Sequence, residues 1–317
     1  MYKILFSRSE KAMRPGIEAY IEYFNQSEEF EVVVNHEGDF VPDYSIFDVV
    51  WECKGIGGVK KGDYVLVHEY NSLSTAPFPK TKNILKVRLN TKPDMRVFLN
   101  KFVAKQFHFK DDVPTFYRDI GIDPQTLTLS QHKNNTKEYD FVYLGAISKA
   151  REIDQLLKGF ITSNTNKSFL LIGDTNNEIY NEFKNEPNIV FTGRVPFKEV
   201  AKIAVKAKYG INYIPDRYPF NIQTSTKLLE YMAMDLKIIT TDYQWVRDFE
   251  KTTQSQFFYI DDKHPTFEMK NIEGFAFKNN AQFEDLYWDN IIDKSGIKHE
   301  LLRQLEAKAT TKRDKRY

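Results

Sequence analysis

Short apolar runs alternate along the chain with segments of helical spacing. The first run, Tyr2–Phe6, is followed by a polar turn at 7–10 and then by four apolar residues at helical spacing between 17 and 24. Further β-type runs begin at Phe30, Phe47 and Tyr64. Because β-branched runs separated by helical or turn segments are typical of crossover connections, this half predicts a parallel sheet.

The same alternation restarts after a looser stretch at 111–138, which ends in a polar segment. The pattern then predicts a helix carrying Ile153, Leu156, Leu157 and Phe160 on one face, and helices at about 178–185, 197–207 and 226–234. It also predicts strands at 141–144, 169–173, 189–193, 210–214 and 237–241. We therefore expect an α/β protein with domains at 1–135 and 136–285, followed by two closing helices within 286–317, and ligands outside the carboxyl ends of the strands.

Composition excludes several classes of protein. The charges nearly cancel, with 45 Lys and Arg against 44 Asp and Glu, so no global charge favours nucleic acid as a partner. A hydrophobic share of 41% with 25 Phe and 18 Tyr excludes a mostly disordered chain. The single Cys53 excludes an internal disulfide and a cysteine-based metal site. With no apolar run of membrane-spanning or signal-peptide length, we expect a cytoplasmic protein.

The segment with the clearest chemistry is 224–242, TSTKLLEYMAMDLKIITTD. Ser225 and Thr226 begin a predicted helix, and the free backbone N–H groups of a helix start suit a diphosphate. Lys227 adds a mobile cation beside them. Glu230 follows about one turn later, where its carboxylate can accept hydrogen bonds from a ribose diol.

This segment resembles the retaining glycosyltransferases of the family-4 type, in which a glutamate, an apolar pair and an alanine precede the turn into an Ile/Val-rich strand. The resemblance assigns ribose binding to Glu230. Residues 141–157 resemble the first strand, glycine loop (Gly145) and helix of that family's donor-binding domain. Two basic residues usually clamp the diphosphate there; Ala146 stands at the first position, and Arg151 aligns with the second.

Residues 188–195 are similar to the strand and glycine turn that lie beside the nucleobase in the same family. The resemblance therefore adds Gly193, Arg194 and Val195 to the nucleotide site.

The chain departs from the family pattern eight positions before Glu230, where the family often has a second glutamate that touches the donor sugar. Ile222 stands there, and the neighbouring Asn221 and Gln223 are the polar substitutes expected to bind sugar hydroxyls. The amino-terminal half resembles the family weakly. His68 is expected just past a strand end, where the family often has a histidine near the reacting sugar, and with it we assign Arg8 and Glu69 to the acceptor side.

The resemblance implies a GT-B fold, with two Rossmann-like domains facing each other across a cleft and the closing helices crossing back to the first domain. It implies transfer of a hexosyl group, with retention, from a nucleoside diphosphate sugar to a hydroxyl of a saccharide or lipid-linked acceptor in surface polysaccharide assembly. We expect no metal and no cofactor. Arg151, Lys227 and the N–H groups near Ser225 and Thr226 would stabilise the leaving diphosphate, and His68 would contact the donor sugar or assist the acceptor.

Two other functions stay open at this stage. A nucleotide-sugar 2-epimerase shares the fold and would release nucleoside diphosphate and an altered sugar without an acceptor. The second alternative is a non-catalytic subunit that binds a nucleotide sugar. It stays open because Ala146 and Ile222 replace polar residues of the family.

Two basic segments suggest a further partner. The segment Asn90–Lys110 is interpreted as a basic amphipathic helix, with core packing as the alternative for its apolar residues, and the tail Lys308–Tyr317 carries a local charge of +4. We therefore expect a peripheral association with the anionic inner face of the plasma membrane.

Overall fold

The computed structural model describes residues 1–8, 15–36, 43–131, 136–163 and 166–314. The chain divides into two compact units. Unit 1 comprises Met1–Gly121 together with Asp285–Tyr317, and unit 2 comprises Ile122–Glu284. The last helices therefore belong to the same unit as the amino-terminal strands. Part of the polar stretch at 131–138 lies outside the described residues.

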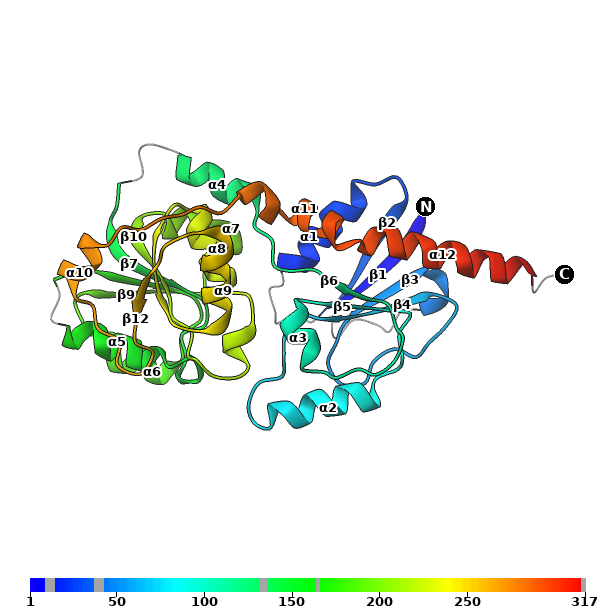
Figure 1. Cartoon of the computed structure of the whole chain (residues 1–317), viewed down its shortest axis with the longest axis horizontal. Coiled ribbons are helices and arrows are strands. Elements are labelled where there is room, and N and C mark those ends of the chain that lie inside the picture. Colours follow the sequence, from blue (N-terminus) through cyan, green and yellow to red (C-terminus); the bar gives the residue numbers. More distant parts are fainter. Residues whose placement is uncertain (9–14, 37–42, 132–135, 164–165, 315–317) are drawn as a thin grey trace. The chain divides into compact units, whose positions relative to one another are not determined.

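Unit 1 contains a six-stranded, wholly parallel sheet with the order β2-β1-β3-β4-β5-β6 (Figure 1). Its strands are β1 (Tyr2–Arg8), β2 (Phe30–His36), β3 (Val49–Cys53), β4 (Val65–Tyr70), β5 (Met95–Phe98) and β6 (Thr115–Tyr117). Its helical elements are α1 (Pro15–Asn25), η1 (Tyr44–Ile46), α2 (Pro79–Leu89), α3 (Lys101–Lys105), α11 (Trp288–Ser295) and α12 (Ile297–Asp314), and the short η4 (Phe283–Leu286) spans the division between the units.

The core of unit 1 explains why its strands read as continuous apolar runs. Residues of α1, α11 and α12 pack on one face of the sheet, around Phe6 and Trp51. A second, smaller cluster around Leu5 and Val50 covers the opposite face. Because neighbouring residues of a strand point to opposite faces, a strand covered on both sides must be apolar throughout.

Unit 2 contains a second six-stranded parallel sheet, with the order β12-β11-β10-β7-β8-β9. Its strands are β7 (Tyr139–Leu144), β8 (Phe169–Ile172), β9 (Ile189–Gly193), β10 (Ala207–Asn212), β11 (Lys237–Thr241) and β12 (Phe258–Ile260). Its helices are α4 (Pro124–Gln131), η2 (Lys149–Arg151), α5 (Ile153–Thr162), α6 (Asn177–Phe183), α7 (Phe197–Ala204), η3 (Phe220–Ile222), α8 (Thr226–Ala233), α9 (Gln244–Thr253) and α10 (Met269–Gly274).

The strand order of unit 2 is that of a doubly wound Rossmann-type sheet. The chain winds outward in one direction from β7 through β8 to β9, and in the other from β10 through β11 to β12. The order reverses between β7 and β10, and ligands of such sheets bind outside the carboxyl ends of the strands at this point. The segments that follow β7 and β10 are therefore where a site is expected.

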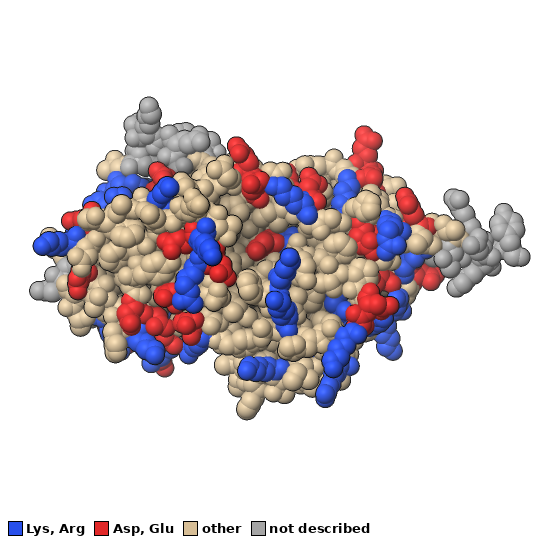
Figure 2. All heavy atoms as spheres, viewed as in Figure 1, with Lys and Arg blue, Asp and Glu red and all other residues tan. Residues whose placement is uncertain are grey.

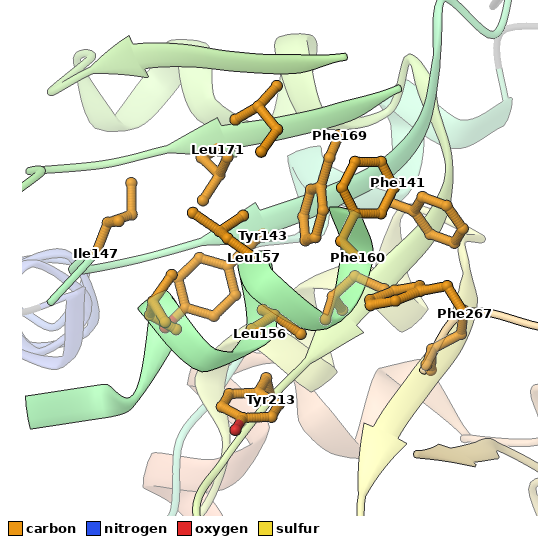
Figure 3. Packing of buried hydrophobic residues seen from close by; sticks show 14 of the residues in the cluster. Phe141, Tyr143, Ile147, Leu156, Leu157, Phe160, Phe169, Leu171, Tyr213 and Phe267 are labelled. Atoms are coloured by element: carbon orange, nitrogen blue, oxygen red, sulfur yellow. The ribbon is translucent and has the colours of Figure 1, made fainter. Parts of the chain in front are cut away.

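An aromatic cluster anchors the segment after β7. The Phe141 ring lies 5.1–5.9 Å, centroid to centroid, from the rings of Phe160, Phe169, Tyr209 and Phe267 (Figure 3). Aromatic pairs of this kind contribute about 0.5–1.5 kcal/mol each beyond their buried area. The predicted stripe of α5 is confirmed, since all four of its apolar residues are buried. The cluster therefore fixes α5 and, with it, the loop that carries Arg151.

The prediction of one basic helix over Asn90–Lys110 is wrong. The segment contains strand β5 and the five-residue helix α3 instead. Phe98, Leu99 and Val103 are buried in unit 1, so the core alternative holds for most of its apolar residues. Arg96 is also buried, and its Nη2 atom donates to Asp111 Oδ2 at 2.7 Å.

Candidate functional site

Three glycines close adjacent strands at the carboxyl edge of the unit 2 sheet. Gly145, Gly173 and Gly193 follow or end β7, β8 and β9 with φ angles of +117°, +145° and +69°. A Cβ atom on Gly173 would lie 2.1 Å from the Gly145 carbonyl oxygen, so only glycine fits there. Gly173 was not among the predicted site residues, although its place at a strand end, like that of the other two, is visible in the sequence. The edge formed by these turns exposes backbone without side chains.

Arg194 and Val195 follow Gly193 at the end of β9, which is the edge strand of the sheet. The Arg194 side chain is exposed and Val195 is half-buried. These residues share the carboxyl edge with the β7–β10 reversal point but follow a strand two positions away from β7.

The start of α8 is fixed by buried hydrogen bonds. The Ser225 hydroxyl caps the helix by accepting from Leu228 N at 3.4 Å, and it donates to Asn212 Oδ1 at 2.7 Å. The Asn212 amide in turn donates to the hydroxyls of Thr240 and Tyr243, both at 2.9 Å. The helix start is thereby tied to the ends of β10 and β11. Its first-turn N–H groups have no intrahelical partners and carry the positive end of the helix dipole.

Lys227 places a buried ammonium group in this first turn. Its Nζ atom lies 4.0 Å from the centroid of the Tyr143 ring and has no hydrogen-bond partner among the described residues. The predicted cation is present, but it is buried rather than mobile. Burial, and secondarily the charge of Arg151, holds the pKa of Lys227 well below its usual range. A buried polar group without a partner costs about 1–3 kcal/mol, which a bound anion would offset.

Two arginines extend the positive charge beside Lys227. The guanidinium of Arg151 lies 5.5 Å from the centroid of the Phe220 ring, and that of Arg217 lies 5.9 Å from the same ring. Arg217 is also held by Glu152, at 3.0 Å, and by the carbonyl of Ala150. Arg217 was missed by the sequence analysis, although it follows β10 as Arg151 follows β7. The segments after β7 and β10 thus bring three cations to the reversal point of the sheet.

Tyr143 lies next to two of these cations, Lys227 and Arg151. Its ring supports Lys227, and burial raises the pKa of its hydroxyl to about 12 although the charge of Arg151 acts in the opposite direction. The tyrosine therefore stays neutral at physiological pH and leaves the positive charge of the site uncompensated.

Glu230 lies one turn beyond Thr226, as predicted, and is partly buried. Burial raises the pKa of Glu230 to about 7, although the charge of Lys227 lowers it. The carboxylate and the protonated acid are therefore both populated near neutral pH.

The two expected sugar-binding amides have different surroundings. The Gln223 side-chain amide donates to the Pro219 carbonyl at 3.0 Å, so this hydrogen bond stabilises the loop that contains both residues. The Asn221 amide donates to Asp216 Oδ1 at 3.0 Å, whereas its oxygen is buried and has no hydrogen-bond partner in the described part of the chain. Asn221 thus has one buried acceptor that is not hydrogen-bonded within the described residues.

The expected acceptor-side residues belong to unit 1, and two of them are buried. The expectation that His68 follows a strand end is wrong, because it lies within β4 and is fully buried, with Nε2 3.4 Å from Glu52 Oε2. Burial lowers the pKa of His68 despite this carboxylate. Glu69 pairs with buried Arg118 and accepts from Trp51 Nε1 at 2.7 Å. Arg8 ends β1, and its side chain lies outside the described residues.

Among the described residues, no group of three or more His, Cys, Asp and Glu side chains is arranged to hold a metal ion. In the same part of the chain, every helix is too short or too polar to span a membrane.

Comparison with known proteins places these features in context. Residues 138–267 match the family model described as "Glycosyl transferases group 1". No curated protein sequence matches the chain.

Solved structures similar to the whole chain include three of particular interest. AviGT4, a glycosyltransferase involved in avilamycin A biosynthesis, is 13% identical with a TM-score of 0.63, over 97% of this chain and 98% of that one. Anabaena Alr3699/HepE in complex with UDP and glucose is 11% identical with a TM-score of 0.60, over 99% and 100%. A UDP-GlcNAc 2-epimerase from Methanocaldococcus jannaschii is 10% identical with a TM-score of 0.53, over 92% and 99%.

The predicted fold class is confirmed, since both units are Rossmann-like and the whole chain matches GT-B structures. At these identities the structural likeness shows the fold alone, and the epimerase shares it. The match to the group 1 model covers the segment that carries all three cations and Glu230. Together the matches support a glycosyltransferase of the GT-B fold.

Proposed function

We propose that the chain is a retaining glycosyltransferase that moves a hexosyl group from a nucleoside diphosphate sugar to a hydroxyl of a saccharide or lipid-linked acceptor. One observation carries the proposal: Lys227 presents a buried, unpartnered ammonium group at the start of α8, next to Arg151, among the described residues of a segment that matches a glycosyltransferase model. Such a group is stabilised by an anion, and a nucleoside diphosphate supplies one.

In this proposal the diphosphate lies over the first turn of α8, between Lys227 and Arg151. Arg217 lies over the same Phe220 ring as Arg151 and adds a third positive charge. Glu230, one turn further along, accepts hydrogen bonds from the ribose hydroxyls in its ionised form. The exposed glycine edge next to β7 allows the nucleotide to approach the backbone closely.

These groups supply what the transfer reaction needs. As the bond between the anomeric carbon and the diphosphate oxygen breaks, negative charge grows on the departing diphosphate. Fixed cations and N–H groups that already point to that position lower the barrier without reorganising. We propose that the residues of this site do so without a metal ion, because the cations at hand can take its place.

The structural neighbours suggest the first donors to test. The HepE structures contain UDP, glucose and UDP-glucose, so uridine nucleotides are the first probes for this chain. We propose that the product belongs to surface polysaccharide assembly in the cytoplasm, as the resemblance of the sequence implies.

Binding and turnover of nucleotide sugars test the proposal. Isothermal titration with UDP, GDP and ADP and their hexose conjugates should identify one nucleotide that binds the wild type and binds Lys227→Met much more weakly. A ligand at a hundred times its dissociation constant should also stabilise the fold by about 2.7 kcal/mol in thermal unfolding.

Product analysis separates the possible functions. Transfer to an added acceptor with retained anomeric configuration, observed by NMR, supports the proposal. Release of nucleoside diphosphate and an altered free sugar without an acceptor indicates an epimerase, and donor binding without any turnover indicates a binding subunit. Either of these results overturns the proposed activity.

A further inference from the structure

Helix α2 of unit 1 and the residue before it expose several large apolar side chains. Phe78 at its N-cap is 75% exposed, and Ile84 and Leu89 within the helix are 49% and 61% exposed. The only fully buried residue described in α2 is a polar one, Asn83, whose side-chain oxygen accepts from Ser74 N at 3.1 Å. The helix therefore buries a polar residue against unit 1 and leaves most of its large apolar residues exposed.

The exposed apolar residues share one face. Leu85 and Leu89 are four positions apart and lie above each other on a helix, and Phe78 precedes Leu85 by two turns. Leu85 is itself 38% exposed. We call Phe78, Ile84, Leu85 and Leu89 the outer face of α2. Large apolar residues gathered in this way mark an interaction surface, unlike apolar residues scattered singly.

The charged residues of the segment that carries the outer face all have one sign. The sequence from Asn71 to Pro93 contains five basic residues and no Asp or Glu. Lys80 and Arg88 are exposed on α2, while Lys82 and Lys86 are half-buried. Lys92 is paired with Asp112 at 2.7 Å. In Figure 2 the lower edge of this unit, where Figure 1 draws α2, shows blue and tan spheres.

We propose that α2 lies flat on an anionic lipid surface, with its outer face among the acyl chains near the headgroups and its cations at the phosphates. Apolar residues flanked by Lys and Arg are the combination that binds such an interface. A second copy of this chain fits the outer face poorly, because its own cations would face those of the first copy. The proposal adds to the proposed function by placing a lipid-linked acceptor beside unit 1, and its test does not depend on turnover.

Vesicle co-sedimentation tests this proposal with matched variants. Wild type should bind vesicles of phosphatidylcholine and phosphatidylglycerol at low salt, should not bind pure phosphatidylcholine, and should be released at about 0.5 M NaCl. The double variant K80E/R88E should lose at least about tenfold in partitioning. Its control, K251E/K270E, makes the same change of charge on exposed lysines of α9 and α10 and should bind like wild type.

The apolar contribution has its own control. L85S/L89S should lose at least about fivefold in partitioning, because the apolar contact with the acyl region is removed. I161S/V190S, which changes two aliphatic residues of unit 2 that are each 37% exposed, should have no effect. In Leu89→Trp, the fluorescence of the new tryptophan should shift to shorter wavelength on anionic vesicles only.

Several outcomes would overturn the proposal. Equal binding to anionic and neutral vesicles would show that α2 is not the contact with the membrane. Equal losses of vesicle binding in K80E/R88E and K251E/K270E would show the same. A wild-type dimer that L85S/L89S converts to a monomer in analytical ultracentrifugation would show that the outer face is covered by a second copy. Nucleotide titration of the same variants keeps the two proposals apart, since K80E/R88E should bind the donor nucleotide as wild type does.

Discussion

Replacing Lys227 by methionine should raise the stability of the free protein and weaken nucleotide binding. The wild-type ammonium group is buried without a hydrogen-bond partner among the described residues. Methionine has a similar length and no polar atom, so the variant avoids a penalty of about 1–3 kcal/mol. For a unit of this size the corresponding rise in melting temperature is roughly 2–12 °C. A residue with only a structural role would change stability in the opposite direction.

The same substitution removes a charged contact with the diphosphate. Hydrogen bonds to charged groups contribute about 1.5–3 kcal/mol, which corresponds to a loss of about 10- to 150-fold in affinity for a nucleoside diphosphate. Thermal unfolding with and without UDP, together with isothermal titration, measures both effects on the same samples. The stabilisation produced by the nucleotide should therefore shrink in Lys227→Met while the melting temperature without nucleotide rises.

The pH dependence of the effect follows from the depressed pKa. Burial lowers the pKa of Lys227 in the folded state, so the unfolded state binds more protons in the window between the folded and unfolded pKa values. The free energy of unfolding of wild type should rise with pH in that window. The difference in free energy of unfolding between wild type and Lys227→Met should therefore become smaller. Lys237→Met is the matched control, because Lys237 is exposed and lies 5.9 Å from the centroid of the Tyr209 ring. A variant that is less stable without nucleotide, or one that keeps wild-type nucleotide affinity, would refute the reasoning.

Three further predictions concern the same site. Glu230→Gln should weaken UDP-glucose binding about 10- to 100-fold at pH 8. The difference in UDP-glucose affinity between wild type and Glu230→Gln should disappear below pH 7, because burial raises the pKa of Glu230 to about 7 and the wild-type carboxylate is then protonated. A difference in affinity that does not change with pH in isothermal titration would contradict this. Arg151→Ala should lower kcat at least about tenfold with a smaller change in donor affinity, since the charge it meets grows in the transition state, and steady-state kinetics with a normal kcat would return Arg151 to a surface role. Turnover should survive excess EDTA, whereas a loss reversed by Mg²⁺ or Mn²⁺ would show that the cations alone do not stabilise the leaving group.

Much of the architecture could be predicted from the spacing of apolar residues. Parallel strands covered on both faces are continuous apolar runs, and those at 141–144, 169–173 and 237–241 all lie within or next to real strands. The spacing of apolar residues does not predict the structure of Asn90–Lys110, because strand β5 in this segment is only four residues long and contains a charged residue. Arg96 sits in that strand because Asp111, fifteen residues later, neutralises it. Local periodicity carries no information about such a partner.

The candidate site was predicted in part for similar reasons. The order of strand, glycine turn and capped helix is local, so Gly145, Ser225 and Glu230 could be named from their neighbours in sequence. The burial of Lys227 depends on Tyr143, more than eighty residues away. His68 illustrates the opposite error: its strand extends three residues further than the apolar pattern suggests, so a residue expected just past the strand end is enclosed. Local sequence therefore places these residues in the order of elements, but it does not give the burial of Lys227 and His68.

The presence or absence of a carboxylate partner distinguishes Lys227 and Arg151 from the cations that stabilise the fold. In unit 1 the buried guanidinium groups of Arg96 and Arg118 are each neutralised by a carboxylate, from Asp111 and Glu69 respectively. An ion pair of that kind satisfies both partners and leaves nothing for a ligand.

In unit 2 the three cations of the candidate site also lie against aromatic rings, as Arg96 and Arg118 do in unit 1, but most of them lack a carboxylate partner among the described residues. Lys227 lies over Tyr143, and Arg151 and Arg217 both lie over Phe220. A ring face stabilises a cation by about 0.5–2 kcal/mol without cancelling its charge, so the positive potential stays available outside the protein. Only Arg217 of these three has a carboxylate within ion-pair distance among the described residues, and that partner is Glu152. A protein that needed these charges only for folding would gain more from carboxylates. Cations whose charge no carboxylate cancels are what a site for an external anion requires, and Lys227 and Arg151 lie where the strand order of the sheet reverses.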